Sequence, residues 1–179
     1  MDFEEMKQRR TVREGYIVLL RAEATLFLPV GYEKLRDFYQ RVADACMNWA
    51  IEIYGESLRK YFLSLSDVRE KSKFRTKQYR FWMRVPWEEG EFATVLCESE
   101  RTEADDKKVF RRISHTWNLT EQTILPIKQV LQLLDQRVDA KDFPFCPDGV
   151  YREADKIVIY KNQTEGELFR EVKFPFQTV

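Results

Sequence analysis

Glycine, proline, histidine and cysteine are all scarce in this chain. Only six glycines and six prolines occur among 179 residues, which argues against long disordered tracts. The three cysteines, Cys46, Cys97 and Cys146, form no C-x-x-C pair, and one histidine cannot complete a Cys/His zinc site. We therefore expect mainly buried free thiols in a reducing compartment, no bound metal and no cofactor.

The sequence also lacks an excess of one charge and any long apolar run. Lysine plus arginine and aspartate plus glutamate number 30 each, so a main role held by nucleic-acid phosphates is not expected. The first 16 residues are charged and lack the apolar centre of a secretion signal. No window approaches the roughly 18 apolar residues of a membrane span. A cytoplasmic protein is the expectation.

Recognisable catalytic and nucleotide-binding motifs are missing as well. The chain contains no glycine-rich phosphate loop, no G-x-S-x-G nucleophile turn and no H-E-x-x-H zinc motif. Its acidic stretches, residues 103–106 and 148–155, do not follow the order of a calcium loop and are typical of solvated turns. We therefore predict that the protein is not an enzyme.

The first half of the chain carries one long alternating pattern and one helical pattern. Apolar residues at every second position predict a strand over 16–28. Steps of three and four predict a helix over 32–53 with Gly55 as its C-terminal cap, followed by a short helix over 58–65. Residues 1–14 are expected to be a charged arm, frayed or briefly helical, before a single domain over 15–179.

The second half alternates in the manner of antiparallel strands around one short helix. The strands and helix expected there are 73–87, 92–100, 109–119, a helix begun near Pro126 that runs to 136, and a hairpin of 156–162 with 168–176. The order β-α(α)-β-β-β-α-β-β predicts an α+β fold. Its sheet is mainly antiparallel, with the long helix of the first half and the shorter helix of the second half packed on it.

One face of the strand 73–87 is a candidate binding surface. Gln78, Arg80, Trp82 and Arg84 alternate with apolar residues and project to the same side. A tryptophan between arginines can stack on a base, a sugar or a partner side chain. The simpler alternative is that Trp82 is covered while the arginines pair with nearby glutamates. The basic stretch 69–84 also admits weak binding of single-stranded nucleic acid.

His115 and Trp117 form the second candidate site. Val109, Ile113, His115 and Trp117 share one side of their strand, which is interrupted by Arg111. This pattern favours a hydrogen-bonded histidine in the packed face. The functional alternative is an enzyme or a carbohydrate-binding accessory in which His115 acts with Trp117 and a carboxylate.

Three stretches resemble a known family. "RRISHTWNLTEQTILPIKQVL", "PDGVYREADKIVIYKN" and "FREVKFPF" are similar to the domain of unknown function DUF3298, found in the extracellular part of lysozyme-sensing anti-sigma factors and in stand-alone bacterial proteins. Residues 16–53 resemble its companion half, DUF4163.

The resemblance implies an α+β fold and a non-catalytic role in binding a ligand or partner. The expected partner is an unknown protein or a cell-wall-type ligand. A homodimer through edge strands is also open, because a long exposed strand invites pairing. Without a membrane span or a sigma-binding segment in the sequence, the anti-sigma activity is not expected.

Overall fold

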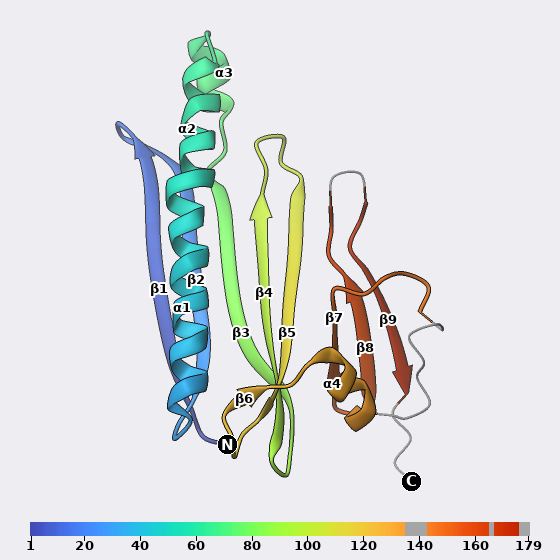
Figure 1. Cartoon of the computed structure of the whole chain (residues 1–179). Coiled ribbons are helices and arrows are strands. Elements are labelled where there is room, and N and C mark those ends of the chain that lie inside the picture. The colour runs from blue at the N-terminus through green and yellow to red at the C-terminus, as the bar shows by residue number, and fades with distance from the viewer. Residues whose placement is uncertain (135–142, 165–166, 176–179) are drawn as a thin grey trace.

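The computed structural model describes residues 1–134, 143–164 and 167–175. A six-stranded sheet dominates the molecule, and a long helix lies across it (Figure 1). Its strands, in spatial order, are β1 (Phe3–Glu14), β2 (Ile17–Pro29), β3 (Lys77–Glu89), β4 (Phe92–Thr102), β5 (Lys108–Asn118) and β6 (Thr123–Ile124). The helical segments between β2 and β3 are α1 (Glu33–Trp49), the π-helical turn η1 (Ala50–Tyr54), α2 (Gly55–Ser64) and α3 (Val68–Lys73).

The large sheet is antiparallel except at one pair. β2 and β3 are parallel because the helical segment returns the chain to the end at which β2 began. The alternating pattern of β2 places alternate apolar residues under the helix, and these are fully buried: Leu20, Ala22, Ala24, Leu26 and Leu28. The expected α+β class, with a mainly antiparallel sheet, one long helix and one short helix, is confirmed.

The residues expected to form a frayed or helical arm are a strand instead. β1 pairs along its whole length with β2, from Phe3 opposite Pro29 to Glu14 opposite Ile17. Its sequence hides the strand, because Val12 is the single residue of β1 that is buried. At the edge of a sheet, charged side chains are compatible with a strand and protect its free edge.

The long helix does not end at Gly55, so the prediction of a C-terminal cap there is wrong. α1, η1 and α2 follow one another without a break (Figure 1). Gly55 has an ordinary helical φ of −61°. A Cβ atom at this position would lie 2.6 Å from Cγ2 of Val12. The glycine therefore serves the close approach of the helix to β1.

The last third of the described chain forms two further layers. Its elements are α4 (Ile127–Leu134) and a small antiparallel sheet of β7 (Gly149–Glu153), β8 (Lys156–Lys161) and β9 (Arg170–Pro175). One face of the small sheet packs through Tyr151, Val158 and Tyr160 on Leu96 of β4. Its other face packs through Val150, Ile157 and Ile159 on Val130 of α4.

The layers therefore run from the long helix through the large sheet and the small sheet to α4. The short helix covers the small sheet and not the large one. β7 lies where the sequence suggested only a connection before the last hairpin, and the predicted end of the short helix at residue 136 lies outside the described residues. None of the helices in the described part of the chain is long and apolar enough to cross a membrane.

Candidate functional site

The face of β3 that the sequence singled out lies partly between the two sheets. Trp82 Nε1 donates a 2.8 Å hydrogen bond to Glu98 of β4, and Arg84 forms a 2.8 Å ion pair with Glu153 of β7. Arg80 is exposed and Gln78 is half-buried. The structure thus gives two of the four residues internal partners. A binding role for this face stays a prediction.

Arg112, which the sequence did not single out, is the centre of this contact between the sheets. Its side chain is buried and pairs at 2.7 Å with both Glu98 and Glu171 of β9. Four aromatic rings surround the guanidinium at 5.0–5.6 Å from their centroids: Phe110, Tyr151, Tyr160 and Phe169. Such a fully paired cation holds the small sheet in register on the large one.

His115 is half-buried and bonded to the long helix. The hydroxyl of Tyr39 lies 3.0 Å from His115 Nδ1, and Trp117 Nε1 donates to the same hydroxyl at 2.9 Å. Burial lowers the pKa of His115, so the ring is neutral at neutral pH. Because the hydroxyl already accepts from Trp117, its own proton is available for Nδ1, an arrangement that favours the Nε2–H tautomer.

His115 also lines a small pocket of about 330 Å³ beside the edge of β5. Ser114 and Asp148 line it too, but they have other partners. The Ser114 hydroxyl bonds to the Val150 carbonyl at 3.2 Å, and the Asp148 carboxylate accepts the Asn162 N–H at 2.7 Å. The hydrogen bonds of the described residues therefore do not connect His115 to a nucleophile or a carboxylate.

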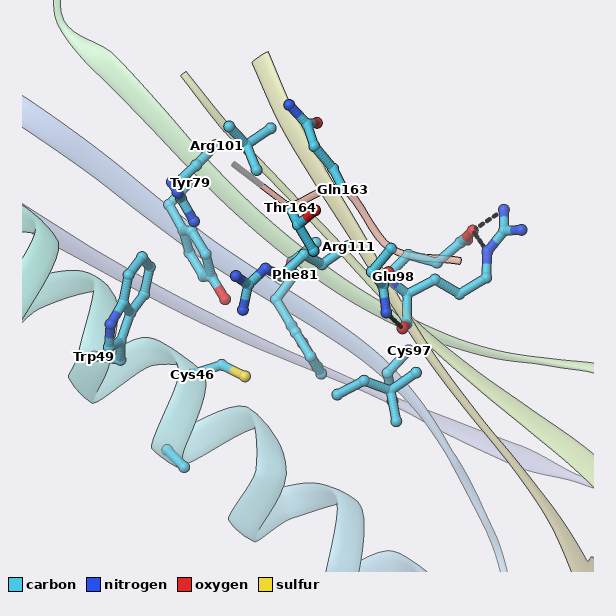
Figure 2. A pocket seen from close by; sticks show the side chains of 16 residues that line it. Cys46, Trp49, Tyr79, Phe81, Cys97, Glu98, Arg101, Arg111, Gln163 and Thr164 are labelled. Atoms are coloured by element: carbon cyan, nitrogen blue, oxygen red, sulfur yellow. Dashed lines mark hydrogen bonds and ion pairs between the residues drawn. The ribbon is translucent and has the colours of Figure 1, made fainter. Parts of the chain in front are cut away.

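A second pocket lies between the long helix and β5. We call this pocket, which has a volume of about 470 Å³, the α1–β5 cleft (Figure 2). α1 runs over β1 and β2 (Figure 1), and the inward residues in the first half of β5, Val109, Arg111 and Ile113, line the cleft. The residues that line the cleft come from α1, from β3, β4 and β5, and from the segment after β8: Ala45, Cys46, Trp49, Tyr79, Phe81, Cys97, Glu98, Ser99, Arg101, Val109, Arg111, Arg112, Ile113, Asn162, Gln163 and Thr164.

The strand register arranges the inner face in rows across the sheet. One row contains Phe81, Ser99 and Arg111, and the next contains Cys97 and Ile113. The surface is mainly apolar, and Ile113 leaves 45% of its area exposed to the opening. The sequence did not identify this cleft as a site. The one feature of the sequence that pointed to the cleft is Arg111, a cation that interrupts an apolar face of its strand.

The groups of the cleft that could react are held in their neutral forms. Burial raises the pKa of Cys46, of Cys97 and of the Tyr79 hydroxyl, which lies against Cys46. A protonated thiol is a poor nucleophile, so neither cysteine is activated. All three cysteines are free, and Cys146 is exposed, in contrast to the expectation of buried thiols. Among residues 1–134, 143–164 and 167–175, no three metal-ligating side chains are grouped to hold an ion.

Comparison with known proteins finds solved structures with the same fold. No family sequence model matches the chain, and no curated protein is detectably similar to it in sequence. The crystal structure of a DUF3298 family protein from Pseudomonas aeruginosa PAO1 matches with a TM-score of 0.58 at 10% identity, over 97% of this chain and 90% of that one. The crystal structure of a DUF3298 family member from Bacteroides fragilis NCTC 9343 matches with a TM-score of 0.55 at 13% identity, again over 97% and 90%.

Both matches extend over nearly the whole chain, so they include the long helix and both sheets. The resemblance of residues 16–53 to DUF4163 stays a prediction. At these identities the likeness establishes the fold, and this chain has the fold of DUF3298 family proteins.

Proposed function

We propose that this protein is a non-catalytic binding domain whose ligand occupies the α1–β5 cleft. The observation that carries the proposal is the cleft itself, an open pocket of about 470 Å³ with a mainly apolar lining. Small-molecule sites in proteins are typically hollows of about 300–1,000 Å³, lined by apolar side chains with a few polar groups. Because segments far apart in the sequence line the pocket, its shape depends on the whole fold.

Two further observations favour binding over catalysis. The thiols of the cleft have raised pKa values, and the described hydrogen bonds of His115 lead to Tyr39 and not to a carboxylate. A general base or nucleophile needs an orienting partner within about 3 Å. The groups present are suited to hold a ligand by contact and hydrogen bonding.

The neutral fluorescent dye N-phenylnaphthylamine tests the proposal, because its emission rises in an apolar pocket. We expect saturable binding of one dye per chain. Ile113→Asp places a charge at the opening of the cleft and should weaken binding about tenfold or more, since a charge disfavours apolar contact. Val68→Asp makes the same change at an 81% exposed position on α3 and should leave binding unchanged.

Two results would count against the cleft as the site. One is a wild-type protein that fails to bind the dye. The other is equal binding by the wild type and the Ile113→Asp variant, which would mean that the dye binds elsewhere.

A further inference from the structure

Arg111 is a cation between apolar residues of β5 that line the cleft. It occupies an inward position on β5, between Val109 and Ile113 on the same face, and lies opposite Ser99 on β4. Its guanidinium projects into the cleft between Tyr79 and Phe81 (Figure 2). Arg111 is exposed, so its guanidinium is accessible to a ligand that enters the cleft.

The other charges that line the cleft already have partners. Arg101 pairs with Glu103 at 2.6 Å and lies over the rings of Trp49 and Tyr54. Glu98 accepts from both Arg112 and Trp82. By contrast, Arg111 forms no ion pair or hydrogen bond with any side chain that the structure describes.

The geometry points to a ligand class, an inference that rests on the proposed function of the cleft. We propose that the cleft selects small amphipathic acids, with the ligand's carboxylate paired to Arg111 and its apolar body lying along Trp49, Phe81 and Ile113. A planar guanidinium can hold a carboxylate through two parallel hydrogen bonds. The Tyr79 hydroxyl, protonated because burial raises its pKa, offers a neutral polar group beside the head group.

A competition series that varies only the head group tests this selection. Octanoate, octanol and octylamine have the same apolar tail and carry a negative, a neutral and a positive head group at neutral pH. Each would be titrated against the wild-type protein loaded with N-phenylnaphthylamine. We expect octanoate to displace the dye at a concentration about tenfold or more below that of octanol, and octylamine to be the weakest of the three.

Variants then assign the preference to Arg111. Arg111→Gln should weaken octanoate about tenfold, to the level of octanol, and leave octanol unchanged, which also shows that the variant is folded. Arg111→Lys keeps the charge and should retain a preference for octanoate. Arg80→Gln is the matched control, because Arg80 is an exposed arginine of β3 that does not line the cleft.

The outcomes distinguish a failure of the proposed selection of acids from a failure of the proposed binding in the cleft. Equal displacement by octanoate and octanol in the wild type would overturn the selection of acids. So would an unchanged octanoate affinity in Arg111→Gln. Either result leaves cleft binding intact, whereas failure of the wild type to bind the neutral dye overturns the proposed function.

Discussion

At the scale of single residues, one hydroxyl joins the long helix to the far side of the sheet. Tyr39 is fully buried and bonds to both His115 and Trp117 on β5. The ring of Phe38 meets both partners edge-on, at centroid distances of 5.4 and 5.6 Å. Here the only histidine of the chain is hydrogen-bonded to a residue 76 positions away.

Removal of this hydroxyl should be costly. Tyr39→Phe keeps the ring but leaves the buried Trp117 N–H and the His115 Nδ1 without their partner. We expect a loss of about 1–3 kcal/mol in the free energy of unfolding, the usual cost of unsatisfied buried polar groups. Urea unfolding measures it. Tyr61→Phe, at a 43% exposed position, should change stability by much less, and equal losses in the two variants would contradict this role of the hydroxyl.

The lowered pKa of His115 predicts a dependence of stability on pH. Its folded pKa lies below the unfolded value of about 6.5, so the unfolded chain binds the proton first, and stability falls as pH decreases below about 6.5. His115→Asn keeps an acceptor near the Nδ1 position but does not titrate. We expect the stability of the wild type to fall more than that of the variant between pH 7 and pH 5. Parallel curves would exclude the histidine as the cause.

Single residues also show what sequence patterns can and cannot give. Alternation placed His115 and Trp117 on the inward face of their strand, with Arg111 as an interruption. The partner of His115 lies on a helix far away in the sequence, and a pattern within one strand carries no information about it. The opening above Arg111 depends on where the helix crosses the sheet, so the cleft could not be predicted from the sequence.

At the scale of elements, the long helix illustrates how a local rule can mislead. A glycine at the end of an apolar helical pattern usually marks a cap. In this chain the helix continues through Gly55, because β1 passes too close for a side chain. The strand that requires the glycine was itself missed, since its charged sequence gives no alternating apolar pattern.

The contact between Gly55 and Val12 predicts that Gly55→Ala changes the free energy of unfolding in the opposite direction to the usual one. In an exposed helix, Gly→Ala stabilises by up to about 1 kcal/mol. Gly55→Ala should instead destabilise by about 1–3 kcal/mol, since its Cβ would meet Val12. In a Val12→Ala background the clash is removed, so the same change should be neutral or stabilising. Thermal or urea unfolding of the four proteins completes the cycle, and a Gly55→Ala effect independent of Val12 would contradict the packing argument.

The packing of the small sheet on the large sheet depends on Arg112. Arg112→Met leaves the buried carboxylate of Glu98 without its main cation, and we expect a loss of about 3–5 kcal/mol. Lys108→Met is the matched control on the same strand. It removes an exposed ion pair with Glu100 and should cost no more than about 1 kcal/mol. Similar urea midpoints for Arg112→Met and the wild type would show that the sheets do not depend on this cation.

At the scale of the whole molecule, the four layers explain where the cleft lies. The long helix covers the inner face over β1 and β2, and the small sheet covers the outer face near β4 and β5. The cleft lies beside the helix, over the inward residues Val109, Arg111 and Ile113 in the first half of β5. The class and most elements could be predicted from periodicity, but the division of the strands into two sheets could not, because it depends on which faces meet in space. A homodimer through edge strands stays a prediction.

The most direct test of the account is to observe the indole N–H signals of the tryptophans by NMR while N-phenylnaphthylamine is added. Trp49 lines the cleft, whereas Trp82 lies between the sheets and bonds to Glu98. Replacing each tryptophan with phenylalanine assigns its signal. The account predicts that the Trp49 signal moves in a saturable manner and by more than the Trp82 signal, because Trp82 does not itself line the cleft. Movement of Trp82 with Trp49 unchanged would contradict it, and would favour the outer face of β3 as the binding surface.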